Sequence, residues 1–193
     1  MLGLKLPTDP RWINIAEKNI DEILTDHAYC EQKAATNAIS MAIQNPGHSD
    51  LVDAMLELAQ EELQHFRMVH GRILQRGGTL GFERRDEYAN ELAAFVRKGH
   101  QKHIVLVDRL LFSAMIEARS CERFRLLSLH ISDASLREFY HELMVSEAGH
   151  YTLFLSFARK YSGGEDVEKR WQEFLEYEAG VISRYGTKES MHG

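Results

Sequence analysis

The sequence predicts an all-α protein: a four-helix bundle with a short crossover helix and an additional C-terminal helix. Two observations lead to this fold class. Only three prolines occur in 193 residues, and two of them lie within the first ten, so long stretches carry no helix breaker. Apolar residues in those stretches recur at alternating steps of three and four, which is the spacing of a buried helix face in a bundle.

Four long helices are predicted as two antiparallel pairs. The first pair is expected at 11–44 and 50–76, separated by NPGHSD, and the second pair at 101–130 and 133–161, separated by ISDAS. The separating segments contain the Gly, Ser and Asp residues that end and begin helices. Each pair should therefore form a hairpin.

Two shorter helices complete the prediction. One near 86–98 follows GGTLGFERR and should cross from the first pair to the second, and a last one near 166–185 follows SGGED. The tail at about 187–193 is expected to fray, since it carries little that could pack.

Composition limits the class of protein. A chain of 22.2 kDa with 44% hydrophobic residues fits a single domain over residues 1–193. Its net charge of −6 argues against a surface that binds nucleic acid throughout, although a local basic face remains open. The two cysteines, Cys30 and Cys121, fit a reducing cytoplasm. No apolar run suits a membrane span and the N-terminus lacks signal-peptide features, so we expect a cytoplasmic protein with no membrane partner.

Each long helix carries a glutamate in its predicted core stripe. The second and fourth helices also carry a histidine three residues later, as Glu62 with His65 and Glu147 with His150. The first and third helices contribute Glu31 and Glu117. Charged groups at these positions need an explanation, because burial of an uncompensated ion costs several kcal/mol.

The four glutamates are predicted to share one level of the bundle. Glu31 and Glu62 lie sixteen and fifteen residues from the turn near Gly47, and Glu117 and Glu147 each lie fifteen residues from the turn near Ser132. At 1.5 Å per residue, this level is roughly 23 Å from each turn. Equivalent residues of the two pairs are 85 or 86 residues apart, which indicates a duplicated helix pair.

A pair of divalent cations would cancel the four buried negative charges. Two glutamates plus two Glu-x-x-His motifs on four helices is the ligand inventory of ferritin-like di-iron and di-manganese bundles. Oxygen and imidazole donors suit iron or manganese, whereas structural zinc favours cysteine. The predicted metal ligands and catalytic centre are therefore Glu31, Glu62, His65, Glu117, Glu147 and His150.

Three further residues are candidates for supporting the ligands. His27 lies four residues before Glu31 and is either such a support or a hydrogen-bonded core histidine. Glu61 is placed to reach the free nitrogen of a ligand histidine from the other pair, or it is a surface glutamate. The matching position in the second half is Ser146, so any such support is asymmetric.

Four segments carry a family resemblance: DHAYCEQKAA, LAQEELQHF, IEARSCERF and SEAGHY. They resemble the bacterial tRNA-(2-methylthio-N6-isopentenyladenosine) hydroxylases, which are ferritin-like non-haem di-iron monooxygenases. The resemblance extends over about 9–185. It implies one iron on Glu31, Glu62 and His65 and a second on Glu117, Glu147 and His150, with Glu62 and Glu147 as bridges.

The resemblance also implies a substrate and a reaction. Dioxygen would be the co-substrate, and the isopentenyl chain of a prenylated adenosine next to the tRNA anticodon would be hydroxylated. An external reductase should supply electrons, because the sequence has no Gly-rich dinucleotide fingerprint. The prenyl group needs an apolar channel, for which Phe112, Met115, Phe124 and Leu143 are candidates unless they are ordinary core.

Basic residues that could contact tRNA phosphates are few on this acidic chain. The candidates are Arg84 and Arg85 in FERRDEY, and Arg119 and Arg123 in EARSCERF, with Lys98 and Lys102 nearby in the sequence; a solvated face is the alternative for all of them. Competing functions for such a bundle are iron storage or ferroxidation, manganese-dependent peroxide disproportionation, and di-iron oxidation of a small molecule.

Overall fold

The computed structural model describes residues 2–185, 188 and 190–192. Within these residues the secondary structure consists of seven α-helices and no strand, so the predicted all-α class is confirmed. The chain divides into two compact units. We call Lys18–Arg85 the hairpin unit; the larger unit is built on Asp86–Lys188 together with the residues that precede Lys18.

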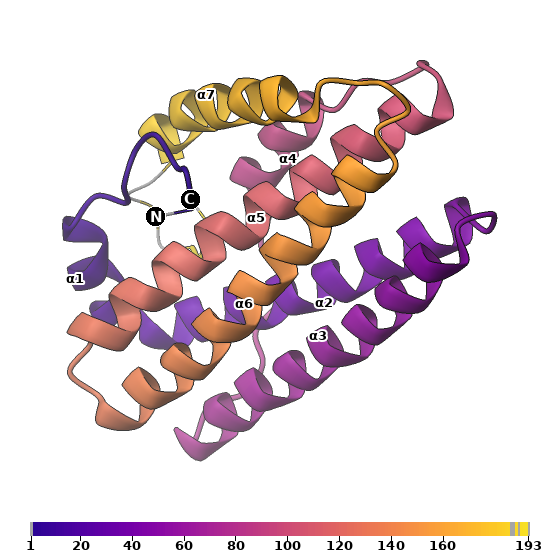
Figure 1. Cartoon of the computed structure of the whole chain (residues 1–193). Helices are drawn as coiled ribbons and strands as arrows, with labels where there is room; N and C mark the ends of the chain where they lie inside the picture. Colours follow the sequence, from indigo (N-terminus) through magenta and orange to yellow (C-terminus); the bar gives the residue numbers. More distant parts are fainter. Residues whose placement is uncertain (1, 186–187, 189, 193) are drawn as a thin grey trace. The chain divides into compact units, whose positions relative to one another are not determined.

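The hairpin unit contains the first predicted pair of long helices. They are α2 (Ile20–Gln44) and α3 (Ser49–Gln75), which run side by side in opposite directions (Figure 1). Asn45 closes the end of α2 by donating from its side-chain amide to the carbonyl of Met41 at 2.8 Å. The buried residues of α3 follow the predicted steps of three and four: Leu51, Met55, Leu58, Glu62, His65, Val69 and Ile73.

The segment after α3 is held against α2. Arg76 donates to the Asp21 carboxylate at 2.8 Å, and the Tyr29 hydroxyl donates to the carbonyl of Gly81 at 3.0 Å. Gly77 lies in the left-handed region at φ 78°, where glycine is favoured, and this conformation turns the chain out of α3.

The larger unit contains the second predicted pair, α5 (Lys102–His130) and α6 (Ala134–Lys160). These helices also lie antiparallel and side by side (Figure 1). Asp133 begins α6 as predicted from ISDAS, because its carboxylate accepts from the backbone N–H groups of Ser135 at 2.9 Å and Leu136 at 3.2 Å.

Two shorter helices, α4 (Glu87–Ala94) and α7 (Val167–Tyr185), contact each other and α5. Asp86 caps α4 by accepting from the backbone N–H of Ala89 at 2.8 Å. Phe95 stacks on Tyr177 of α7 with ring centroids 4.3 Å apart. The predicted crossover helix and C-terminal helix are both present, although α4 ends four residues earlier than expected.

A buried carboxylate fixes the start of α5 to its neighbours. Asp108 is fully buried and accepts from Arg97 at 2.8 Å and from Arg170 of α7 at 2.7 Å. Burial alone would raise the pKa of Asp108, but the hydrogen bonds from Arg170 and Arg97 outweigh it and hold this pKa below its ordinary value.

The predicted continuous helix over 11–44 is wrong at one point. It is divided into α1 (Arg11–Lys18) and α2 by Asn19, whose backbone at φ −124° and ψ 35° is not helical. α1 buries Trp12, and the ring of Trp12 lies under the Arg123 guanidinium at 4.0 Å within the larger unit. The break lets α1 pack there while α2 belongs to the hairpin unit.

The expectation of a frayed tail does not hold for the described part of it. Met191 and His192 are buried, and His192 contacts the Ser120 hydroxyl at 2.9 Å and stacks on Tyr88 with centroids 5.9 Å apart. Residues 187, 189 and 193 of the predicted tail lie outside the described residues. The polar composition of the tail therefore did not indicate that these residues are buried.

Two wider expectations concern the whole chain. That residues 1–193 form a single domain stays a prediction, since the two units are each described by themselves. Among the described helices, none has both the length and the apolar character needed to cross a bilayer.

Candidate metal centre

The hairpin unit gathers three predicted ligands on its buried face. Glu31 comes from α2, and Glu62 and His65 come from successive positions of the α3 stripe. His65 Nδ1 lies 3.3 Å from a carboxylate oxygen of Glu62 and 3.7 Å from one of Glu31. One ligand atom from each residue falls within 4.8 Å of the others. We call these three residues the α2–α3 set.

The larger unit gathers the other three predicted ligands in the same way. Glu117 comes from α5, and Glu147 and His150 come from α6. His150 Nδ1 lies 3.4 Å from a carboxylate oxygen of Glu147, and one ligand atom from each of the three residues lies within 4.8 Å of the others. We call them the α5–α6 set. Each helix hairpin thus brings together glutamates that are distant in the sequence.

All six side chains are buried, with at most 6% of any residue exposed. In each set two carboxylates stand close together away from water, where their repulsion and lost hydration cost several kcal/mol unless a cation compensates. One divalent ion per set cancels the two charges. Carboxylate oxygens and imidazole nitrogens are suitable donors for iron or manganese, so the donor chemistry fits a metal in each set.

The orientation of the two imidazoles supports this assignment. Both turn Nδ1 toward the carboxylates of their set, and Nε2 toward a residue one helical turn earlier. His65 Nε2 lies 3.9 Å from the Glu61 carboxylate, and His150 Nε2 lies 3.5 Å from the Ser146 hydroxyl. A partner on the second nitrogen fixes the ring orientation of a metal-binding histidine. Glu61 and Ser146 stay candidates for supporting the two rings, but Glu61 is half exposed and faces His65 of its own helix rather than a histidine of the other pair.

His27 contacts a predicted ligand directly. It is fully buried, and its Nε2 lies 2.5 Å from a carboxylate oxygen of Glu31, one helical turn away. The two interpretations of His27 are therefore compatible, since a hydrogen-bonded core histidine at this position also orients the Glu31 carboxylate.

The prediction that Arg119 and Arg123 contact tRNA is wrong. Both are fully buried in the larger unit, so neither guanidinium can reach a phosphate. Arg119 pairs with Glu122 and donates to Glu178 of α7 at 2.6 Å. Burial, followed by repulsion from Arg119, lowers the pKa of Arg123 to about 9.

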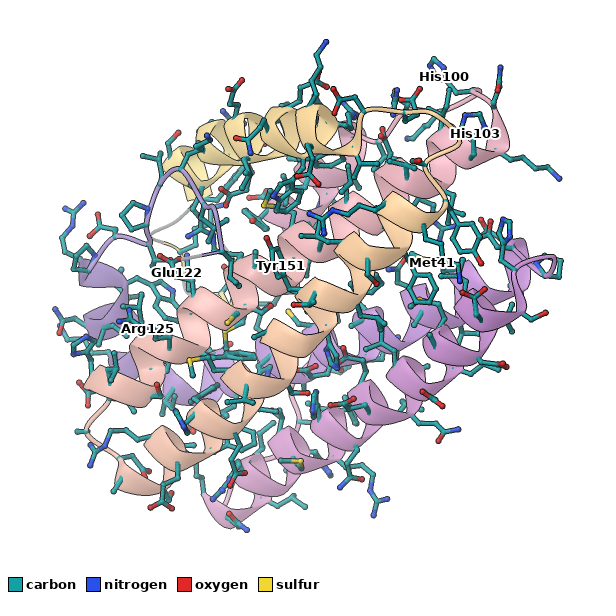
Figure 2. All side chains as sticks on the ribbon, viewed as in Figure 1. Met41, His100, His103, Glu122, Arg125 and Tyr151 are labelled. Atoms are coloured by element: carbon teal, nitrogen blue, oxygen red, sulfur yellow. The ribbon has the colours of Figure 1, made fainter. Side chains whose placement is uncertain are left out.

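This buried network ties the N-terminal segment to α5. Glu122 accepts from the backbone N–H of Thr8 at 2.9 Å (Figure 2), and Glu178 also accepts from the Tyr88 hydroxyl at 3.0 Å. Sequence reasoning missed Glu178, although the signal was present. It lies in the apolar stripe of α7, with Trp171, Phe174, Leu175, Val181 and Ile182.

The other predicted tRNA contacts are accessible. Arg85 is exposed, and the Arg84 side chain is 38% exposed with its guanidinium 3.6 Å from Glu22. Both belong to the segment between α3 and α4, in the hairpin unit. They remain candidates for contact with a polyanion.

Antiparallel pairs of long helices that each bury a glutamate and a Glu-x-x-His motif are typical of one class of protein, the ferritin-like carboxylate proteins, and the buried donors fit a di-metal site. The particular family follows from comparison with known proteins. A family model described as tRNA-(MS[2]IO[6]A)-hydroxylase (MiaE) matches residues 2–193. The chain belongs to this family, and the resemblance seen in the sequence is confirmed.

Two curated relatives carry the name tRNA 2-(methylsulfanyl)-N(6)-isopentenyladenosine(37) hydroxylase. The one from Pseudomonas putida is 40% identical over 166 residues, which cover 86% of this chain and 80% of the relative. The one from Salmonella typhimurium is 30% identical over 228 residues, covering 93% of this chain and 83% of the relative.

A solved structure is also similar. It is described as protein 43 with aldehyde deformylating oxygenase activity from Synechococcus, and it matches with a TM-score of 0.90 at 34% identity. The match covers 98% of this chain and 95% of that one. An oxygenase neighbour agrees with the predicted ferritin-like fold and with an oxidoreductase.

Proposed function

We propose that this chain hydroxylates the isopentenyl group of a 2-methylthio-N6-isopentenyladenosine in tRNA, the nucleoside for which its curated relatives are named. One observation carries most of the weight: the hydroxylase family model spans residues 2–193, the range that contains both ligand sets. A prenylated base next to the anticodon is unpaired, so it can be presented to a buried site without opening a duplex.

In this proposal each ligand set binds one iron ion. Glu31, Glu62 and His65 would hold one iron ion, and the remaining three ligands would hold the other. Glu62 and Glu147 would each supply a buried carboxylate that compensates the charge of the ions. Manganese remains the alternative metal, because it accepts the same oxygen and nitrogen donors.

When bound, reduced iron supplies the activation of dioxygen that hydroxylation of an unactivated C–H bond needs. The protein's own part is to hold the donors and exclude water. His27 holds the Glu31 carboxylate at 2.5 Å, and the residues behind Nε2 of each ligand histidine hold the two rings. The aliphatic residues that flank the ligands in each stripe keep bulk water from the donors.

Two partners are part of the proposal. Electrons come from a separate reductase, since the sequence has no dinucleotide-binding fingerprint. The tRNA substrate is held partly by Arg84 and Arg85, local positive charge on a chain of net charge −6. A cytoplasmic location agrees with a tRNA substrate and with Cys30 and Cys121, which form no disulfide.

Mass spectrometry of tRNA nucleosides tests the function. A host strain that lacks this chain should lose hydroxylated prenyladenosine and accumulate the unhydroxylated form. The wild-type chain should restore the product, and so should Glu57→Ala, which changes an exposed carboxylate on α3. Glu147→Ala should not restore it. Normal levels of hydroxylated nucleoside in the deletion strain would contradict the proposal.

Oxidation of a small molecule is the second candidate function, favoured by the similarity to the Synechococcus protein with aldehyde deformylating oxygenase activity. The two functions separate in one assay. Iron-loaded protein is given reductant and dioxygen with either prenylated tRNA or a long-chain aldehyde. Turnover of the aldehyde alone would favour the second candidate, whereas iron uptake or peroxide disproportionation without either substrate would favour a ferroxidase or catalase.

A further inference from the structure

Phe82 is the most exposed large apolar side chain among the described residues, with 96% of its surface accessible. It lies in the segment between α3 and α4, in the hairpin unit. Scattered apolar residues on a surface are ordinary, but a ring that makes almost no contact with its own protein gains nothing from folding. The contacts of the residues on either side of Phe82 explain why the ring is exposed.

The backbone on both sides of Phe82 is attached to α2. On one side, the Gly81 carbonyl accepts from the Tyr29 hydroxyl at 3.0 Å, and a Cβ at Gly81 would lie 3.2 Å from the Thr25 methyl, so the chain packs closely here. On the other side, Glu83 pairs with Lys33 at 3.1 Å. Phe82 therefore projects from an anchored loop and does not owe its exposure to a loose one.

The basic residues that follow Phe82 in the same segment indicate the kind of partner. Arg85 is exposed three residues on, and no carboxylate partner of Arg85 occurs among the described residues. The Arg84 guanidinium lies 3.6 Å from Glu22, so Arg85 is the clearer of the two candidates for a phosphate. An exposed aromatic ring and an exposed guanidinium in one short segment suit a base and its phosphate better than an apolar protein face, which needs a contiguous patch.

We propose that Phe82 is a stacking platform for an unpaired base of the tRNA anticodon loop, with Arg85 contacting a neighbouring phosphate. This inference rests on the proposed function and adds a specificity element to it. Single-stranded RNA bases are commonly bound by stacking on exposed aromatic side chains, while basic groups hold the backbone. The partner is thus the loop that carries the prenylated adenosine.

Binding of a synthetic anticodon stem–loop that carries the prenylated adenosine tests the proposal. Phe82→Ala should weaken binding roughly 5- to 150-fold, the effect of removing one base–aromatic stack, and Phe82→Trp should restore it. The matched control is Ile43→Ala. Ile43 is also apolar, 71% exposed and in the hairpin unit, but it lies fourteen residues beyond Tyr29 on α2, about 21 Å away.

Salt dependence separates the two proposed contacts. Loss of a stack removes no ion pair, so Phe82→Ala should leave the slope of log affinity against log salt unchanged. Arg85→Ala should reduce the steepness of that slope by about 0.7, the value for one phosphate contact on a single strand. Both variants should keep the wild-type melting temperature and metal content.

Each contrary outcome has a distinct meaning. Wild-type affinity in Phe82→Ala, or an equal loss in Ile43→Ala, would overturn the stacking role while hydroxylation by the wild-type chain left the proposed function intact. Unchanged RNA affinity with slower reduction by the electron donor would assign Phe82 to a protein partner and overturn the inference. A wild-type chain that neither binds nor hydroxylates the stem–loop would overturn the inference and the proposed function together.

Discussion

Each predicted ligand histidine has a polar side chain near its Nε2, and this neighbour differs between the two sets. His65 has a half-exposed carboxylate, Glu61, behind its ring, whereas His150 has the Ser146 hydroxyl. A carboxylate makes an imidazole a stronger donor than a hydroxyl does. The two metal positions are therefore expected to be chemically unequal, although their ligand residues repeat along the sequence.

The first prediction concerns the glutamates assigned as bridges. After loading with iron, the wild-type chain should hold about two ions, and Glu62→Ala or Glu147→Ala should lose most of this metal because each removes a buried donor that compensates the cations. Metal analysis of the desalted proteins measures this. Glu57→Ala is the control on α3, and full occupancy in both ligand variants would refute the assignment.

The second prediction concerns the buried carboxylate at the start of α5. The pKa of Asp108 lies below its ordinary value of 3.8, so its ion pairs stabilise the fold above that pH and lose their effect as the pH falls through the lowered pKa. Asp108→Asn should lower the free energy of unfolding by about 1–3 kcal/mol near neutral pH, since it weakens hydrogen bonds to charged groups.

Urea unfolding of wild type and Asp108→Asn from about pH 7 to about pH 2 measures this dependence. The difference between the two proteins should shrink below pH 3.8. Asp53→Asn, at an exposed position of α3, is the control and should differ little from wild type. A constant difference for Asp108→Asn at all pH values would contradict the account.

The surroundings of some residues could be predicted from the sequence, and those of others could not. The burial of Glu62 and His65 in the α3 stripe could be predicted from the apolar spacing, and a polar residue at such a position requires a compensating partner. Arg119 and Arg123 also lie among apolar residues of α5. Their sequence is equally compatible with an exposed basic surface. Glu122 lies three residues after Arg119 on α5, but the partners Glu178 and Trp12 come from elements far apart in the chain, and a local pattern does not bring those together.

At the scale of elements, helix ends were predictable where side-chain caps are strong. Asp133 and Asp86 cap their helices as such residues do. The break at Asn19 was not predictable from the apolar pattern, which continues through it. Trp12 of α1 packs against Arg123 of the larger unit, and a local pattern does not report such a tertiary contact.

The third prediction uses two glycines with opposite roles in their elements. Gly71 lies inside α3 with nothing within 4 Å of an added Cβ, so Gly71→Ala should stabilise the chain by about 1 kcal/mol through helix propensity. Gly163 has φ +59° and an added Cβ would lie 2.5 Å from the ring of His103, near the start of α5 (Figure 2). Gly163→Ala should therefore destabilise it by about 1–3 kcal/mol.

Equilibrium unfolding of the two glycine variants in urea checks both signs at once. Each variant acts as the control for the other, because the chemical change is the same and only the surroundings differ. Stabilisation in both variants, or destabilisation in both, would contradict the described packing at one of the two sites.

At the scale of the whole molecule, the duplicated helix pair could be predicted because its spacing repeats along the sequence. The anchored tail could not, since the contacts of His192 with Ser120 and Tyr88 join residues from opposite ends of the larger unit. The same holds for Thr8 with Glu122. Such long-range polar contacts depend on the fold already being formed.

The fourth prediction concerns removal of metal from the whole chain. Binding to the folded state alone adds about 2.7 kcal/mol per site at a metal concentration one hundred times Kd, so the metal-free protein should melt earlier. Far-UV circular dichroism should still report most of the helix content, because apolar burial along the stripes remains. Identical melting curves would contradict a bound cluster, and two separate transitions in the loaded protein would contradict the single-domain prediction.

The fifth prediction tests the proposed tRNA hydroxylation most directly. Iron-loaded protein is incubated with tRNA containing the prenylated adenosine, a reductant and isotope-labelled dioxygen, and the nucleosides are analysed by mass spectrometry. We expect a hydroxylated prenyl group that contains one oxygen atom from the labelled gas, and no product with Glu147→Ala. An unchanged prenyl group with fully loaded wild-type protein, or product oxygen that comes from water, would contradict the proposal.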